Sequence, residues 1–375
     1  MKVFYFNYSH DVQLSSGDTM YNLSKNVRAL EFALQPLAIF SSAFGDVVAV
    51  HPEMVSACEV FYNRDFFKGV KFVSASSMPA APVEPWGWDA GVALVIKKAM
   101  QTDRYVLKQD QLTKIRMLSS RQNVSVCLDK LFSLMPQTPL CGRSDFYVLK
   151  EKLMAEMPQK CVLKAPWSSS GRGIRYKNGA LDDRLEAWID RVLQVQGGIE
   201  VEPYYDKLSD WAMEFYADAD GKVSYTGLSR FFTSPLSGYT GNLVAPQEQL
   251  EREWCAQLPA YVFQDVRRSL EIVLSQMVED VYYGPIGVDM MFCKEGDGVV
   301  LHPCVEINFR RTMGQVAQSV AERFPSSVPS RMELVYKPSP TALRAFFASK
   351  DADAVRLLTP LTDKTQFAAY LDFIV

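Results

Sequence analysis

Two apolar segments near residue 290 constrain this chain most, because each carries a carboxylate and the two can pair as a β-hairpin. The segments are Gly287–Cys293 and Val299–Asn308. Between them lies Asp297-Gly298, a dipeptide favoured in two-residue hairpin turns. With the turn at these two residues, we expect Asp289 to face Glu306 across the strands, with side chains roughly 5 Å apart.

Facing carboxylates repel one another, so this pair favours a divalent cation between them. Asn308 lies on the same face as Glu306, because side chains alternate along a strand. Oxygen ligands without Cys or His favour Mg²⁺ or Mn²⁺ over zinc. The sequence therefore predicts Asp289, Glu306 and Asn308 as metal ligands. The alternative is a turn elsewhere, such as Glu295-Gly296, with these residues solvated at a sheet edge.

The segment after this hairpin has the pattern of a helix N-terminus. Thr312 and Gln315 have the spacing of a capping box, and Val316, Val320 and Phe324 continue a helical apolar stripe. Arg310 and Arg311 precede it. A helix N-terminus beside two arginines suits phosphate, although an ordinary surface helix fits the pattern equally well.

A second candidate for phosphate binding is the Ser/Gly-rich segment that follows Lys164. The lysine ends an apolar strand, and the segment Ser168–Gly173 can bring backbone N–H groups close to phosphate oxygens. A Walker loop places its lysine after the last glycine and opens a helix. Here the lysine comes first and Ile174–Tyr176 indicates a returning strand, so we expect strand, loop, strand. An ordinary turn between strands has the same appearance.

Composition describes a folded, multidomain protein. The 375 residues are 48% apolar and 22% charged, which suggests two to three domains and excludes disordered and fibrous classes. A net charge of −3 makes nucleic acid an unexpected partner. The N-terminus lacks the apolar run of a signal peptide, and no stretch is apolar enough for a membrane helix. Seven widely spaced cysteines without a C-x-x-C pair indicate reduced core residues, so we expect a cytoplasmic protein without a membrane partner.

Apolar patterns along the chain predict strands alternating with helices, and so an α/β layer domain in the N-terminal third. Its expected strands and helices are Val3–Phe6, Leu23–Leu37, Val47–Val50, Val70–Val73 and Ala90–Met100. Later helices are expected at Asp182–Val195 and Tyr261–Val281, and later strands at Trp211–Ala217 and Val223–Phe232. Pro85–Asp89, with two tryptophans, is either a packed connection or the wall of a substrate cleft. His10, His51 and His302 have no convincing partner as catalytic bases and are expected to be packed or solvated.

These features in this order resemble the ATP-grasp superfamily, which includes D-alanine–D-alanine ligase and biotin carboxylase. The resemblance spans about residues 115 to 325. It rests on Lys164 before Ser168-Ser169-Ser170-Gly171-Arg172-Gly173, then Val201-Glu202-Pro203-Tyr204-Tyr205, then Asp289, then Glu306-Ile307-Asn308 with Arg310. It implies an α/β (α+β) fold of two α+β subdomains that grip ATP, preceded by a small α/β domain. The boundaries would be 1–112, 113–208 and 209–375.

The resemblance also implies roles for single residues. Lys164, Ser169, Ser170, Gly171 and Gly173 would hold the ATP phosphates; Glu202, Pro203 and Tyr204 would form the hinge that binds adenine; and Asp210 would bind ribose. Asp289, Glu306 and Asn308 match the family's magnesium ligands, and Arg310 matches a basic residue near the transferred phosphate. Arg121 stands in the place of the family's first phosphate lysine, which is a departure from the pattern.

The reaction implied is an ATP- and Mg²⁺-dependent ligation. ATP would phosphorylate a substrate carboxylate, and an amine or thiol would displace phosphate from the acyl phosphate. Lys164 and Arg310 would neutralise the transferred group, while Arg230 and a loop at Gly238–Asn242 would hold the substrate. The alternatives are a kinase acting on a small-molecule hydroxyl and a protein that only binds ATP. The expected partners are small carboxylates and amines, and a homodimer is left open.

Overall fold

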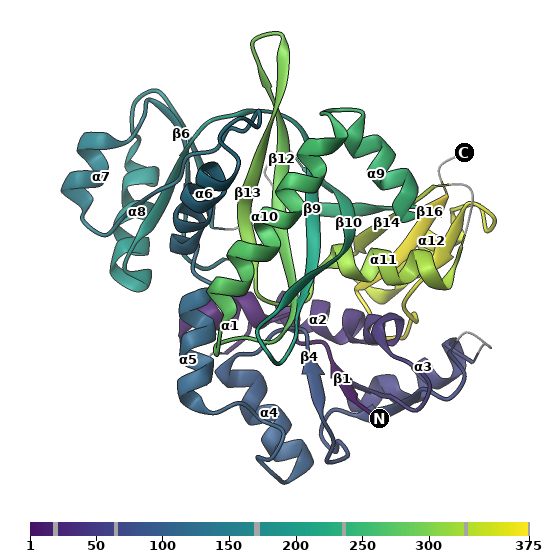
Figure 1. Cartoon of the computed structure of the whole chain (residues 1–375). Helices are drawn as coiled ribbons and strands as arrows, with labels where there is room; N and C mark the ends of the chain where they lie inside the picture. Colours follow the sequence, from purple (N-terminus) through teal and green to yellow (C-terminus); the bar gives the residue numbers. More distant parts are fainter. Residues whose placement is uncertain (18–21, 64–66, 169–172, 235–237, 326–328, 374–375) are drawn as a thin grey trace.

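The structure is a computed structural model that describes residues 1–17, 22–63, 67–168, 173–234, 238–325 and 329–373. These residues form three β-sheets that follow one another along the chain, with helices around them (Figure 1). The chain therefore has the mixed α/β class that the sequence predicts. None of the helices in the described ranges is long and apolar enough to cross a membrane.

The first sheet is parallel, with the strand order β3-β2-β1-β4. Strands β1 and β2 are apolar and buried along their whole length, as is typical of parallel strands covered by helices. The strands are β1 (Val3–Tyr5), β2 (Val47–Val50), β3 (Lys71–Ser74) and β4 (Val83–Pro85). The helices are α1 (His10–Ser16), α2 (Lys25–Leu34), α3 (Val55–Phe61) and α4 (Ala90–Met100), with 3₁₀ helices η1 (Gln35–Ser41) and η2 (Pro52–Met54). The strands and helices predicted for this third are confirmed, with small shifts at their ends.

The second sheet is antiparallel, with the order β5-β8-β6-β7, and packs against helices α7 and α8. The Asp182 side chain caps α8 by accepting a hydrogen bond from the Leu185 N–H at 2.7 Å, and Gly197 ends the helix in a left-handed conformation. The elements are β5 (Asp145–Tyr147), α7 (Lys150–Glu156), β6 (Lys160–Lys164), β7 (Ile174–Asn178), α8 (Asp183–Gln196) and β8 (Ile199–Pro203).

The third sheet is antiparallel and the largest, with the order β13-β12-β9-β10-β11-β14-β16-β15. Helices α9 and α10 pack on one face around Trp211, Trp254 and Phe292, while α11 packs on the opposite face, next to the first sheet's helices (Figure 1). Its strands are β9 (Asp206–Ala217), β10 (Val223–Thr233), β11 (Tyr239–Val244), β12 (Gly284–Glu295), β13 (Gly298–Asn308), β14 (Ser330–Tyr336), β15 (Val355–Leu357) and β16 (Phe367–Phe373). Its helices are α9 (Gln247–Cys255), α10 (Ala260–Val278), α11 (Met313–Arg323) and α12 (Pro340–Ala348).

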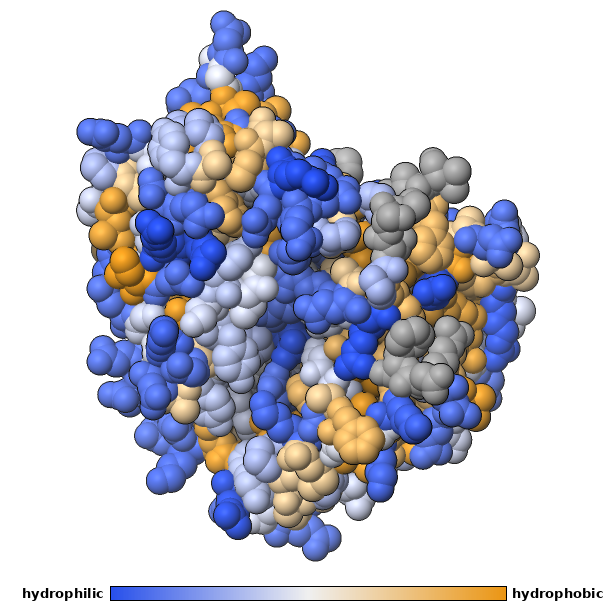
Figure 2. Space-filling model, turned by 45° about the vertical axis from the view of Figure 1, so that its right-hand side comes forward, coloured by the Kyte–Doolittle hydropathy of each residue, from blue (hydrophilic) through white to orange (hydrophobic). Residues whose placement is uncertain are grey.

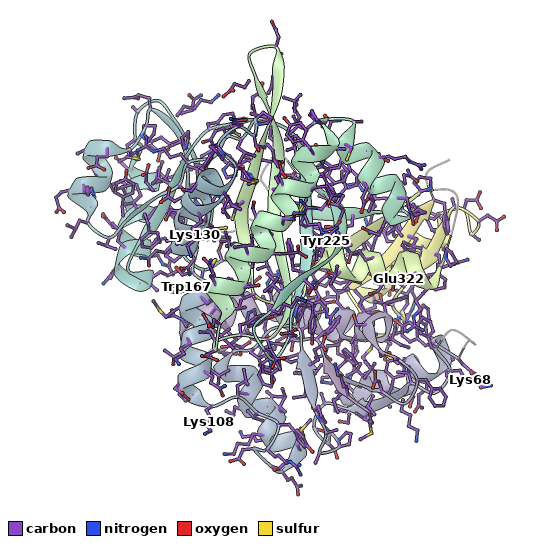
Figure 3. All side chains as sticks on the ribbon, viewed as in Figure 1. Lys68, Lys108, Lys130, Trp167, Tyr225 and Glu322 are labelled. Carbon is purple, nitrogen blue, oxygen red and sulfur yellow. The ribbon has the colours of Figure 1, made fainter. Side chains whose placement is uncertain are left out.

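Two helices connect the first sheet to the second and brace the third. They are α5 (Gln109–Leu118) and α6 (Gln122–Leu134), and α6 packs against β13 and α10. Lys130 on α6 donates a hydrogen bond to Gln276 on α10 at 2.9 Å (Figure 3). Trp167 lies between α8 and α5, where its indole N–H donates to the Arg116 carbonyl at 2.9 Å (Figure 3). The second and third sheets are thus held close together.

The β12–β13 hairpin confirms the predicted carboxylate pair but corrects the predicted turn. Glu295 pairs with Gly298, so the turn is Gly296-Asp297 and not Asp297-Gly298, and Gly296 adopts the left-handed conformation that this turn requires. The hairpin projects from the body of the molecule (Figure 1), and its tip is hydrophilic (Figure 2).

A β-bulge nearer the body restores the predicted register. Met291 pairs with His302, whereas Asp289 pairs with Glu306. Between these pairs β12 has one residue and β13 has three, among them Pro303, which has no N–H to donate to the ladder. The bulge therefore offsets the misplaced turn, and Asp289 faces Glu306.

Candidate active site

A cavity of about 960 Å³ lies where the three sheets meet. Residues from all three sheet regions line this cavity. They include Tyr8 and Trp86 from the first-sheet region, Lys164 and Glu202 from the second sheet and Asp289 from the third sheet. Most of the predicted site residues also line it. Among the described residues the exceptions are Arg230 and Gly173. Ser169, Ser170 and Gly171 lie outside the described residues.

The carboxylate pair opens into this cavity. Asp289 on β12 faces Glu306 on β13, and Asn308 lies on the same face of β13, opposite Gly287. Burial, and then the nearby Glu306 and Glu214 carboxylates, raise the pKa of Asp289 well above its ordinary value. Within the described residues, the Asp289 side chain has no hydrogen bond or ion pair. Two carboxylates and an amide at one spot, with the Asp289 carboxylate lacking a donor among the described residues, form an oxygen-rich site.

Glu306 has a cationic partner in the free protein. Arg121, at the start of α6, is buried and contacts Glu306 Oε1 at 2.7 Å. The same guanidinium donates to the Ala165 carbonyl at 2.6 Å and to the Ser168 hydroxyl at 2.7 Å. Arg121 therefore connects the carboxylate pair to the strand end that precedes the Ser/Gly-rich segment.

Lys164 lies at the end of β6 with its ammonium group buried between carboxylates. Its Nζ is 2.6 Å from Glu202 Oε1 and 3.9 Å from Glu200 Oε2, and it donates to the Val305 carbonyl at 3.1 Å. Burial lowers the lysine pKa, but Glu200 and Glu202 outweigh burial and raise it. Burial raises the pKa of Glu200 to about 7, against the opposing effect of Lys164.

The strand, loop and strand predicted around Lys164 are confirmed at both ends of the loop. Lys164 pairs with Ile174 across the antiparallel β6–β7 ladder. The Ala165 N–H donates to the Gly173 carbonyl at 2.8 Å. A Cβ atom at Gly173 would lie 2.3 Å from the Ser168 Cβ, so the chain needs glycine there.

The segment predicted as the adenine-binding hinge follows Lys164 along the cavity wall. Glu202 and Pro203 end β8, and Tyr204 continues into the connection to β9. The Tyr204 ring is half-exposed, and the Lys160 ammonium lies 3.9 Å from its centre. Asp210 on β9 also lines the cavity, and it contacts Lys207 at 2.5 Å and Thr233 at 2.8 Å.

Arg310 lies in the cavity, whereas Arg230 does not. Arg310 donates from Nε to Asp11 at 2.8 Å and from Nη1 to the Arg311 carbonyl at 3.0 Å. Ser229 and Phe231 line the cavity, so Arg230 between them points to the other face of β10, where it pairs with Glu253 of α9 at 2.8 Å. The prediction that Arg230 binds substrate is therefore wrong.

The remaining segments predicted near the site are partly confirmed. Gly238–Asn242 is not a closing loop, because Tyr239–Val244 forms β11, but Tyr239 and Asn242 line the cavity. Trp86 lines the cavity, while Trp88 is buried in the core. Arg311 pairs with Glu84.

The helix N-terminus predicted at Thr312 is confirmed. The Gln315 N–H donates to the Thr312 hydroxyl at 3.1 Å, and the Thr312 N–H donates to the Gln315 side chain at 3.2 Å. This capping box begins α11 at the cavity wall.

Sequence reasoning missed two carboxylates and misjudged one histidine. Glu214 on β9 lies beside the α11 N-terminus, accepts hydrogen bonds from Ser229 at 2.9 Å and Thr312 at 2.8 Å, and has a pKa that burial raises to about 7. A lone acidic residue in the apolar segment Trp211–Ala217 was the available signal. No sequence pattern marks Asp11, because it is distant from Arg310 in the chain and contacts it only in the folded protein. His10 is packed as predicted, but it has a partner, with Nδ1 3.0 Å from Asp89 Oδ2.

In the described ranges, no three or more His, Cys, Asp or Glu side chains lie close enough together to hold a metal ion. The predicted ligand set is smaller, because it contains two carboxylates and one amide. It can hold a metal ion that takes its remaining ligands from water and phosphate oxygens, as Mg²⁺ commonly does.

No family model and no curated protein sequence matches this chain. Solved structures do. A carboxyaminoimidazole ribonucleotide synthase from Aspergillus clavatus complexed with ATP is similar over 100% of this chain and 93% of its own, with a TM-score of 0.53 and 14% identity. An N5-carboxyaminoimidazole synthetase from Staphylococcus aureus complexed with ADP has the same coverage, a TM-score of 0.52 and 11% identity. At this identity the likeness bears on the fold, and it agrees with the resemblance found in the sequence. The chain has the ATP-grasp fold.

Proposed function

We propose that this protein is an ATP- and Mg²⁺-dependent ligase that joins a carboxylate to an amine and releases ADP and phosphate. The observation that carries the proposal is the paired Asp289 and Glu306, which open into the same cavity as Lys164 and Glu202–Tyr204. The ATP- and ADP-bound structures of the same fold support a nucleotide in this cavity.

ATP would occupy the cavity between the second and third sheets. Adenine would lie against Pro203 and Tyr204, ribose near Asp210, and the phosphates near Lys164 and Arg121. Both cations are buried and already held by several partners. Preorganised buried cations stabilise phosphate charge more than exposed ones, because water screens them less.

The residues present fit Mg²⁺. Asp289 has no donor in the described structure, Glu306 faces it, and the amide of Asn308 lies on the same face. These three side chains would hold the ion. When bound, Mg²⁺ would neutralise the phosphate oxygens and the repulsion between the two carboxylates.

The chemistry has two displacement steps. In the first, a substrate carboxylate oxygen attacks the γ-phosphorus of ATP, an O–P bond forms, and the bond to the β-phosphate oxygen breaks to release ADP. In the second, the amine nitrogen attacks the acyl carbon, a C–N bond forms, and phosphate leaves with the C–O bond electrons while the amine proton passes to solvent. Lys164, Arg121 and Arg310 would bind and orient the charged groups in both steps.

Thermal unfolding with ATP, with Mg²⁺ and with both tests the nucleotide and metal site. A ligand at 100 times its Kd stabilises by about 2.7 kcal/mol, or about 3 °C for a chain of this length. We expect the full shift to need both ligands and to shrink in Asp289→Asn and Glu306→Gln. Glu295→Gln is the matched control, because Glu295 is exposed on the same hairpin. An equal shift in Asp289→Asn would contradict the proposal.

Phosphate release tests the reaction class. A ligase should release free phosphate only when a carboxylate and an amine are both present. A kinase that acts on a hydroxyl would instead form ADP and a stable phosphorylated product without an amine. Chromatography of the products alongside a phosphate assay distinguishes the two.

A further inference from the structure

The end of the cavity farthest from the second sheet is not needed by a nucleotide. We propose that this end, over β10, β11 and β14, binds an amine substrate through an apolar or aromatic side group. That the bound amine is a substrate rests on the proposed function. That an amine binds at this end does not.

The sheet order places this end well away from the metal ligands. From Asp289 on β12 to Leu334 on β14 the order is β12-β9-β10-β11-β14, which is four strand spacings or about 19 Å. The described residues predicted to bind adenine, ribose and phosphate lie on or beside β6, β8 and the start of β9, with Arg121 before α6. Asp210 on β9 pairs with Phe231 on β10, so the boundary between the two ends lies there. A second molecule therefore has room beyond the phosphates.

The walls of the far end are apolar and aromatic. Phe231, Tyr239 and Leu334 come from the sheet and Met313 from the start of α11. Tyr8 and Leu30 come from the first-sheet region of the chain. These six side chains, which we call the apolar end, are partly exposed to the cavity in the free protein. A ligand that covers them removes apolar surface from water.

The two ends of the cavity differ in how many charged side chains line them. Lys160, Lys164, Lys177 and Lys207 line the nucleotide end, together with acidic residues. Near the apolar end, the described cavity lining offers Arg310, which Asp11 neutralises at 2.8 Å, and the buried carboxyl group of Glu214. An amine can donate a hydrogen bond to Glu214, whereas a phosphate finds no unpaired cation among the described lining residues of this end.

The Aspergillus clavatus enzyme, solved with ADP and 5-aminoimidazole ribonucleotide, matches this chain with a TM-score of 0.51 and 12% identity. A ribonucleotide carries a phosphate group. The apolar end is suited instead to an amine that has an uncharged apolar or aromatic group and no phosphate.

Ligand-observed NMR titration of the full-length protein with phenethylamine tests this inference. The titration is run with and without ADP and Mg²⁺, and ribose 5-phosphate is added as a competitor. Leu334→Lys and Leu30→Lys place a cation at the apolar end from two different elements, β14 and α2, so one variant remains informative if the other does not fold. Leu134→Lys is the control, because Leu134 is exposed at the end of α6.

We expect saturable binding of phenethylamine to the wild type, weakened about tenfold by either wall variant and unchanged by Leu134→Lys. ADP affinity should be the same in all four proteins. No binding to the wild type, binding to both wall variants as tight as to the wild type, or displacement by ribose 5-phosphate would overturn the inference. Failure of ADP and Mg²⁺ to bind would contradict the proposed function instead, and the titration without nucleotide would still decide the question of the apolar end.

Discussion

Replacing Lys164 by methionine should destabilise the protein even without any ligand. The side chain is 4% exposed, and its ammonium group is the cation closest to Glu202, at 2.6 Å, with Glu200 at 3.9 Å. Methionine has a similar length but no charge, so Lys164→Met leaves two buried carboxylates without their cation. Removal of one partner from a buried ion pair costs about 3–5 kcal/mol. With an unfolding entropy of about 2.1 cal/mol/K per residue, the loss for 375 residues is about 4–6 °C in Tm.

The assay is thermal unfolding followed by circular dichroism at pH 8, arranged as a double-mutant cycle with Glu202→Gln. The double variant should recover much of the lost stability, because it removes one unpaired carboxylate. Lys177→Met is the matched control. Lys177 is also buried in the second sheet, but its ammonium group donates to the Pro158 and Gln159 carbonyls and pairs with no carboxylate in the described structure. Its loss should cost about 1–2 kcal/mol.

Two results would refute this reasoning. One is a Tm for Lys164→Met equal to that of the wild type at pH 8. The other is a double variant whose loss equals the sum of the two single losses, because the carboxylates would then not depend on the lysine. A further check is pH, since the pKa of Glu200 is raised to about 7 and its protonation at pH 5 should lessen the cost of Lys164→Met.

Three further variants test other features. Burial raises the pKa of Glu214 to about 7 in the folded protein, so this group should contribute a loss of stability, approaching about 3 kcal/mol, as pH rises from about 4.5 to 7. Glu214→Gln should remove that contribution from the pH dependence in urea titrations, and an unchanged pH profile would contradict the assignment. The Tyr8 hydroxyl is buried without a hydrogen-bond partner among the described residues, so Tyr8→Phe should stabilise the free protein by about 1 kcal/mol in the same titrations, and a loss would mean the hydroxyl is satisfied. Arg230→Met should leave ADP affinity unchanged by calorimetry and cost at most about 1 kcal/mol, because Arg230 lies outside the cavity in a half-exposed pair with Glu253.

Local patterns predicted the elements well, because their causes are local. The capping box at Thr312, the strand before Lys164 and helix α4 each depend on residues within a few positions. The hairpin likewise has a short loop, so alternation and a turn dipeptide predicted that the two strands pair. The turn itself was misplaced by one residue, and the bulge that contains Pro303, a signal the prediction did not use, restored the pairing of Asp289 with Glu306.

Side-chain partners from distant segments could not be predicted. Arg230 and Arg310 look alike in sequence, but the pleat turns one toward α9 while the other meets Asp11, which lies 299 positions away in the chain. Glu214 gained its role when α11 began beside β9, which brought Thr312 to its carboxylate. Such pairs depend on how the sheets pack, and periodicity within one segment carries no information on that packing.

The bulge in β13 makes the two halves of the projecting hairpin independent in register. Beyond the bulge, Met291–Glu295 pairs with Gly298–His302 in one register. Nearer the body, Asp289 pairs with Glu306 in a different register. Residues added at the exposed turn would lengthen the far half without shifting the near one, because the extra residues of the bulge already absorb a mismatch. A fluorophore attachment site or an affinity peptide inserted between Gly296 and Asp297 should therefore leave the carboxylate pair intact, and the tip becomes a point for tethering the protein to a surface with its cavity free.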